Sequence, residues 1–259
     1  MTNETTHKLV VDGHVHLYPC FDTARFLTAA QTNLAVAAHR YGAGAGALLF
    51  TETARDNAFD ALKEGSLLPP GWQADGAADD PALLLRSEQG GLPLIIVAGR
   101  QIQTRERIEV LALASDAPVP ADGTALAEVL AALAADGVPA VLPWGVGKWM
   151  GDRGRVVTQT FAQTPGLLAG DNAGRPVGWP APALFAGHPV IPGTDPLPYS
   201  GAETNVGRYG FVLEAPVALS RPGAAIRAWL AGLTASPPSF GRRAGPTGFA
   251  VGQARMRMG

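Results

Sequence analysis

Residues 8–16 read KLVVDGHVH, and this stretch decides how the fold is interpreted. An apolar run is followed directly by Asp12 and then by two histidines, His14 and His16. Such a run predicts a buried β-strand whose C-terminal end carries polar groups. Because alternate residues of a strand point to the same side, we expect His14 and His16 to aim two imidazoles into one space.

Strand-like and helix-like segments alternate along the rest of the chain. The clearest helix is predicted at residues 122–137, DGTALAEVLAALAADG, with Asp122 or Thr124 as its cap and Gly137 at its end. Further strands are predicted within residues 47–50, 92–102, 107–116, 138–145, 166–174 and 188–196, and further helices within 22–40, 54–65 and 222–233. This alternation, with seven or eight strand candidates, predicts a (β/α)7-8 TIM-like barrel of the α/β class.

Composition narrows the classes of function. The chain has 259 residues, 47% of them hydrophobic and 16% charged, which predicts one large barrel domain over residues 1–259. A net charge of −2 argues against a nucleic-acid or anionic-membrane partner. The single cysteine, Cys20, and the polar N-terminus predict a cytoplasmic protein. The basic tail at 236–259 is interpreted as a solvated end, with contact to an anionic partner as the alternative.

The histidine pair makes a metal site the leading hypothesis. In a barrel, the C-terminal ends of the strands converge on one mouth, where active sites lie. Neutral imidazoles bind zinc and other first-row metals, and a catalytic site adds another protein ligand and an open position. Asp171 and Asp195, each at the end of a later predicted strand, would complete a site for one divalent ion, zinc or manganese, with no organic cofactor. The alternatives are hydrogen-bonded loop histidines and aspartates that only form Asx-turns.

Other polar residues follow apolar runs and are candidates for the same mouth. Glu52 directly follows a predicted strand, where it is either a ligand or general base, or a carboxylate at a helix N-terminus. The loop at 142–154 carries Trp144 and Lys148, and we interpret it as a substrate lid, with a packed loop as the alternative. Lys148, Arg100 and Arg175 are candidates for neutralising an anionic group of a small-molecule substrate.

Several of these segments, taken in order, resemble a known family. DGHVHL is similar to the first motif of the PHP-type (polymerase and histidinol phosphatase) metal-dependent phosphoesterases, and more distantly of the amidohydrolase superfamily. Residues 51–53, TET, stand where the family has Thr-Asp-His, and residues 193–196, GTDP, stand where it has Gly-Ser-Asp-Ala-His. AGRQIQTRERIEVLALA places Arg100 near an expected acidic ligand, and AVLPWG lacks the histidine of the family's Ala-His-Pro.

The resemblance spans most of residues 8–215 and implies a distorted (β/α)7 barrel that hydrolyses phosphoesters with metal assistance. The family's trinuclear cluster would lack most of its ligands here, leaving His14, His16 and Asp195, with Glu52 and Asp171, for one metal. The sequence therefore predicts a metal-dependent hydrolase in which Asp195 or Glu52 takes the proton. Phosphoesters are its first expected substrates, and amides or lactones its second. The alternative is an eroded barrel that binds a ligand or partner without catalysis.

Overall fold

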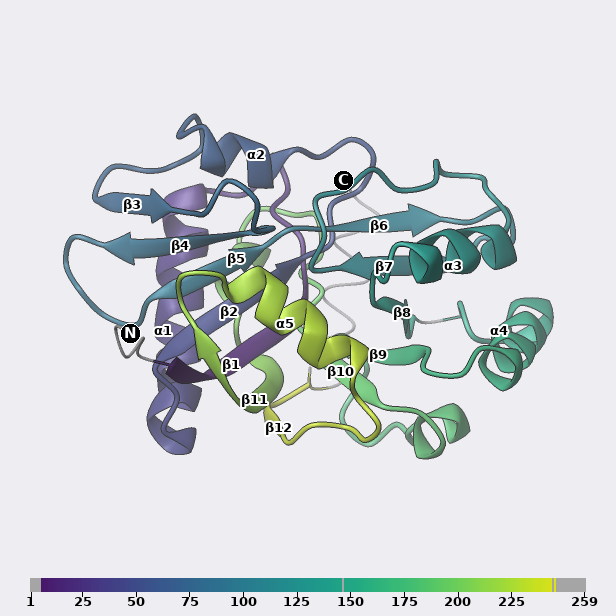
Figure 1. The fold of residues 1–259 in the computed structure, drawn as a ribbon. Helices are drawn as coiled ribbons and strands as arrows, with labels where there is room; N and C mark the ends of the chain where they lie inside the picture. The colour runs from purple at the N-terminus through teal and green to yellow at the C-terminus, as the bar shows by residue number, and fades with distance from the viewer. Residues whose placement is uncertain (1–5, 146, 244, 246–259) are drawn as a thin grey trace.

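The strands of the protein form two mixed sheets that lie side by side (Figure 1). The computed structural model describes residues 6–145, 147–243 and 245. The seven-stranded sheet has the order β12-β11-β1-β2-β5-β4-β3, and the five-stranded sheet has the order β10-β9-β8-β7-β6. The strands are β1 (Thr6–Val15), β2 (Ala45–Phe50), β3 (Trp72–Asp75), β4 (Ala82–Ser87), β5 (Leu94–Val97), β6 (Gly99–Gln103), β7 (Glu109–Leu113), β8 (Ala140–Pro143), β9 (Leu168–Asn172), β10 (Val190–Gly193), β11 (Tyr209–Ala218) and β12 (Ser239–Gly241).

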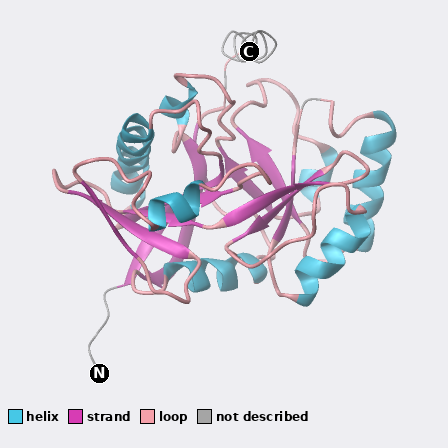
Figure 2. Cartoon of the chain, turned by 90° about the horizontal axis from the view of Figure 1, so that it is seen from above, coloured by secondary structure: helices cyan, strands magenta, loops and turns pink. Residues whose placement is uncertain are grey.

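Helices lie on either side of the strands (Figure 2). They are α1 (Thr23–Tyr41), α2 (Ala58–Lys63), α3 (Leu126–Ala135), α4 (Gly151–Gln163) and α5 (Pro222–Ala231), with the 3₁₀ turns η1 (Ala183–Ala186) and η2 (Ala202–Asn205). The predicted helix at 22–40 is confirmed as α1: Asp22 accepts a hydrogen bond from the Arg25 N–H at 2.9 Å, which caps the first turn. Gly42 ends it in the left-handed conformation.

Two apolar layers cover the seven-stranded sheet. On one face, Phe26 and Leu34 of α1 pack against Val10, Leu48 and the strands beside them. The other face meets α5 and the inner face of the five-stranded sheet, in a cluster that joins residues of both sheets. The outer face of the five-stranded sheet is covered by α3 and α4. The interior that the two sheets share is therefore where polar groups from both sheets can meet.

The predicted TIM-like barrel is wrong, because neither sheet closes on itself in the described part of the chain. Two features prevent closure. The segment predicted as one strand at 92–102 divides at Ala98, so that β5 stays in the first sheet and β6 begins the second. The β3–β4 hairpin, from a region without predicted strands, pairs antiparallel with the free edge of β5. That edge is where a further parallel barrel strand would have to add.

Smaller expectations also changed. Neither Asp122 nor Thr124 caps α3, which begins after Ala125, and its Leu126 N–H instead donates to Glu106 Oε2 at 2.9 Å. Most of the predicted basic tail lies outside the described residues, including Arg255 and Arg257. Among the residues that the structure places, none of the helices has the length and apolar character of a membrane span.

Candidate metal site between the two sheets

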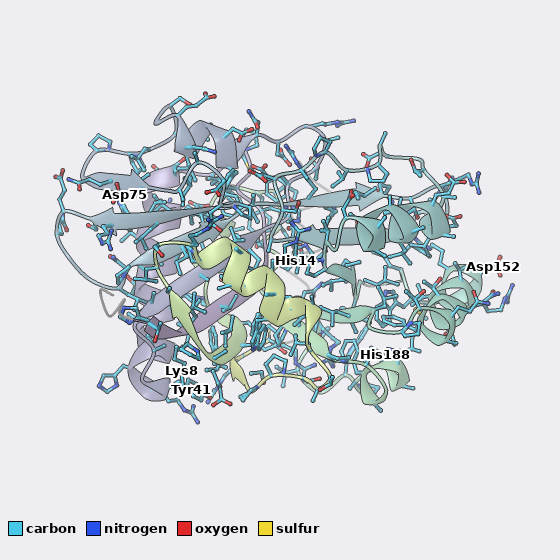
Figure 3. The ribbon with its side chains drawn as sticks, viewed as in Figure 1. Lys8, His14, Tyr41, Asp75, Asp152 and His188 are labelled. Carbon is cyan, nitrogen blue, oxygen red and sulfur yellow. The ribbon has the colours of Figure 1, made fainter. Side chains whose placement is uncertain are left out.

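A β-bulge in β1 decides which way the two histidines point. Asp12 pairs with Leu48 of β2, but the next pair is Val15 with Phe50, so β1 holds one extra residue here. The extra residue reverses the alternation, and Val15 packs on the α1 side of the sheet as Val10 does. His14 and His16 therefore turn to the opposite side, toward the five-stranded sheet. Figure 3 shows His14 near the middle of the molecule, between its two halves.

The segment DGH of β1 interlocks with the segment GTD at the end of β10. Buried Asp12 accepts hydrogen bonds from the Thr194 N–H at 2.7 Å and the Thr194 hydroxyl at 2.5 Å. The Asp195 N–H donates to the His14 carbonyl at 2.8 Å. Gly193 lies so close to His14 that an added Cβ would come within 2.3 Å of the His14 nitrogen. The two segments are thus in contact at three successive positions.

This interlock brings three potential ligand atoms together. His14 Nε2 and His16 Nε2 are 3.1 Å apart, and Asp195 Oδ1 lies 3.5 Å from the first and 3.8 Å from the second. The histidines are 4% and 2% exposed, whereas the side chain of Asp195 is 26% exposed. Asn172, at the end of β9, donates to Asp195 Oδ2 at 3.1 Å and fixes the carboxylate. The structure therefore gathers His14, His16 and Asp195 into one cluster.

Burial keeps both imidazoles neutral, the form that binds metal. Desolvation lowers the pKa of His14 to about 4, and the pKa of His16 also falls to about 4 through burial and the nearby His14. Burial raises the pKa of Asp195, an effect that His16, Lys148 and the Asn172 hydrogen bond oppose. Burial likewise raises the pKa of Asp12 to about 7, against hydrogen bonds from Thr194 and others. The neutral rings of His14 and His16 thus face the carboxyl group of Asp195 at close range.

The surroundings of the two rings differ. The side chain of Gln101 on β6 acts on His14 and opposes the fall in its pKa. The ring of His16 stacks on that of Tyr18, with centroids 5.0 Å apart and an interplanar angle of 15°. His16 Nδ1 is buried and has no hydrogen-bond partner among the described residues. Among the residues that the structure describes, His16 Nδ1 therefore lacks the outer hydrogen bond that metal-binding histidines usually have.

Glu109 is a charged neighbour of this cluster that was not predicted. It begins β7, and its carboxylate Oε1 lies 2.5 Å from Lys148 Nζ. Both charges act on His14. Glu109 begins a strand and does not follow one: β7 runs antiparallel to β6 and β8, so its first residue lies where those two strands end. The connection between β6 and β7 spans only residues 104–108, which is too short for a parallel crossover, so the sequence did carry a signal for the antiparallel direction that the barrel prediction did not use.

Lys148 reaches Glu109 through a glycine-rich turn. The Lys148 N–H donates to the Gly145 carbonyl at 3.0 Å, and the lysine stem folds back over Gly145, where a Cβ would meet Lys148 Cδ at 2.5 Å. Trp144 joins the same region, since its carbonyl accepts a hydrogen bond from Asn172 Nδ2 at 2.8 Å. Its ring packs edge-on against Trp179. Of the residues predicted to bind substrate, Lys148 and Trp144 therefore lie beside the cluster.

The other two predicted carboxylates have partners elsewhere. Glu52 Oε1 accepts from the Phe59 N–H at 2.8 Å at the start of α2, and Arg100 lies 3.5 Å from its Oε2. Arg100 also donates to the Asp56 carbonyl at 3.0 Å. These contacts match the helix-terminus interpretation of Glu52, and burial, despite them, raises its pKa. Glu52 does not join the three-residue cluster.

Asp171 belongs to a separate buried network. Both of its oxygens accept hydrogen bonds at 2.7 Å from Arg175, and the Tyr209 hydroxyl donates to Oδ2 at 2.9 Å. The bidentate hydrogen bond raises the pKa of Arg175. Strand alternation explains the separation, since Asn172 faces Asp195 and its neighbour Asp171 faces the other way. The structure therefore places Asp171 and Arg175 together, in a network that does not include the histidine pair.

Comparisons with known proteins bear on the fold. No protein-family model and no curated protein sequence matches this chain. The crystal structure of PsfC from Pseudomonas syringae PB-5123 is similar in fold, with a TM-score of 0.60 and 17% sequence identity over 97% of this chain and 98% of that one. The predicted relation to PHP and amidohydrolase proteins is therefore wrong, since the architecture is the two-sheet arrangement shared with PsfC. At this identity the likeness concerns the fold alone.

Proposed function

We propose that this protein binds one divalent metal ion through His14 Nε2, His16 Nε2 and Asp195, and uses it to activate water for hydrolysis. The observation that carries the proposal is the triangle of 3.1, 3.5 and 3.8 Å between these atoms. Ligands at about 2.0–2.1 Å from a tetrahedral zinc ion lie roughly 3.3–3.4 Å apart. The three atoms therefore already have nearly the spacing that such an ion requires.

The donor set also suits a catalytic ion. Two neutral imidazoles and one carboxylate are first-row metal ligands, and three protein ligands leave a fourth position for water. A bound ion lowers the pKa of that water and polarises the bond under attack. Asp195 is the partly exposed member of the cluster, so we assign its carboxylate the role of taking the proton. Glu52 is not assigned this role, because its carboxylate is held at the start of α2.

The position and charge of Lys148 favour an anionic small molecule as the substrate. Its side chain is 38% exposed, and its positive charge acts on both histidines and on Asp195. A phosphate or carboxylate group that approaches the ion would compete with the Glu109 carboxylate for this ammonium group. Phosphoesters are our first choice of substrate, and amides or lactones our second.

A second candidate function is binding of a ligand or partner without catalysis. It is favoured by the burial of His14 and His16, which leaves Asp195 as the most accessible member of the cluster. A site of this kind would hold its ion without admitting a bulky substrate.

Metal analysis of the purified protein tests the proposal. We expect close to one equivalent of zinc or manganese in the untagged protein, and loss of this metal in a His14→Ala, His16→Ala double variant. His39→Ala, on the exposed side of α1, is the matched control and should keep the metal. Absence of binding at micromolar metal concentration would refute the proposal.

Activity assays then separate the two candidates. Chromogenic phosphate esters, lactones and anilides are supplied to metal-loaded protein and to protein treated with a chelator. Hydrolysis that is lost with the chelator and in the double variant supports the enzyme. Stoichiometric metal without turnover of any of these substrates favours the binding protein.

A further inference from the structure

We infer that Asp12 and Thr194 are positioning residues of the metal site, which set the distance between the histidine pair and Asp195. The inference rests on the proposed function, because it concerns the same three ligands. Neither residue belongs to the cluster itself. Both act through the segments that carry the ligands: Asp12 precedes His14 by two residues, and Thr194 directly precedes Asp195.

The ligands come from two different sheets. His14 lies near the end of β1 in the seven-stranded sheet and His16 directly follows that strand, whereas Asp195 follows β10 in the five-stranded sheet. β1 and β10 are not paired strands, so no ladder of backbone hydrogen bonds fixes their relative position. The spacing of the three ligand atoms must therefore be set by other contacts at this junction.

Asp12 supplies the side-chain hydrogen bonds of this junction. It is fully buried, and its two oxygens accept four hydrogen bonds: from the Thr194 N–H at 2.7 Å, the Thr194 hydroxyl at 2.5 Å, the Gly207 N–H at 2.9 Å and the His14 N–H at 3.4 Å. Its carboxylate thus joins β1, the end of β10 and the turn before β11. Removing one partner from a buried arrangement of this kind leaves an unsatisfied polar group.

The backbone of Asp195 shows what this anchoring maintains. Asp195 has a φ of +46°, in the left-handed region that residues other than glycine seldom adopt. Its N–H donates to the His14 carbonyl at 2.8 Å, and the Thr194 side chain holds the preceding residue against Asp12. If the Thr194 anchor is lost, the turn is free to relax toward a commoner conformation, which moves the Asp195 carboxylate relative to the two rings.

The test compares Thr194→Val with Thr194→Ser. Valine keeps the shape of threonine but removes the hydroxyl, whereas serine keeps the hydroxyl. Each variant is titrated with cobalt(II), and both the dissociation constant and the visible absorption spectrum of the bound ion are recorded beside thermal melting. We expect Thr194→Val to bind cobalt about 10- to 100-fold more weakly with an altered spectrum. We expect Thr194→Ser to stay within about threefold of the wild type.

A matched control and a second variant distinguish failure of the positioning role from failure of the proposed metal site. Thr158→Val removes a hydroxyl that bonds the Gly154 carbonyl on the exposed side of α4, and it should change neither readout. If Thr194→Val does not fold, Asp12→Asn decides, because it replaces one of the two acceptor oxygens, each of which receives two donors, by an NH2 group that cannot accept a hydrogen bond. Wild-type affinity and spectrum in the folded variant would overturn the inference while the proposed function stands. A wild-type protein that binds no cobalt would overturn both.

Discussion

Replacing Gly193 by alanine should both destabilise the protein and disable the metal site. A Cβ at this position would lie 2.3 Å from the His14 nitrogen, 2.6 Å from its Cβ and 2.9 Å from the Gly13 carbonyl carbon. Ordinary contact begins at 3.4 Å, so the end of β10 must move away from β1 by about 1 Å. Flexible side chains cannot absorb this movement, because two of the three atoms belong to the backbone.

The size of the effect follows from that displacement. Overpacking of a well-packed interior costs about 1–3 kcal/mol, which corresponds to a fall in melting temperature of roughly 2–12 °C for a domain of this size. Metal–ligand distances tolerate errors of about 0.2 Å, so a shift of about 1 Å takes Asp195 out of ligand range of an ion held by the histidines. We therefore expect the affinity for cobalt(II) to fall by about tenfold or more.

Cobalt titration and thermal melting of Gly193→Ala measure these two effects. Gly187→Ala is the control, because that glycine has a φ of −108° and nothing within 4 Å of an added Cβ. The reasoning is refuted if Gly193→Ala melts within about 1 °C of the wild type and binds cobalt with wild-type affinity.

Two further predictions concern pH and the second buried network. In metal-free protein, the pKa of His14 and of His16 is about 4, against about 6.5 when unfolded, so the unfolded chain binds more protons between these values. The two histidines should therefore each lower the free energy of unfolding by about 2 kcal/mol from pH 7 to pH 5. Asp12, whose pKa is raised to about 7, acts in the opposite direction over the same range. Urea titrations of the wild type beside a His14→Gln, His16→Gln variant isolate the histidine contribution, and the variant should lose less stability on acidification than the wild type does. Asp171→Asn should cost about 3–5 kcal/mol by leaving buried Arg175 uncompensated, yet leave cobalt affinity unchanged. Weaker cobalt binding in a folded Asp171→Asn variant would contradict the separation of this network from the metal site.

Local sequence patterns predicted part of the fold correctly. Helical spacing and the Asp22 cap predicted α1, and apolar runs predicted the strands that precede the histidine pair and Asp195. Such features depend on residues a few positions apart, which is why they are readable in one dimension. The error lay in the step from strands to architecture. Strand direction and partners depend on contacts far apart in the chain, and the alternation of segments was compatible with a barrel that the β3–β4 hairpin prevents.

For the candidate site too, the sequence predicted some features and only the structure supplied the others. From the sequence came the residue types: two histidines one residue apart at a strand end, and an aspartate in the GTD turn. Simple alternation predicted that the rings share one side, but only the bulge between Asp12 and Val15 decides which side that is. The position of Glu109 was missed although the short connection between β6 and β7 requires antiparallel strands and so brings the start of β7 to the end of β6.

The sequence by itself determined which chemical groups this protein has and which short segments present them. The tertiary structure decided which of those groups meet: it gathers His14, His16 and Asp195, and it places Glu52 at a helix start and Asp171 against Arg175. The physical reason is that distances near 3 Å between residues some 180 positions apart come from packing and buried hydrogen bonds. Here they come from Gly193 against His14 and from Thr194 bound to Asp12, contacts that no local pattern specifies.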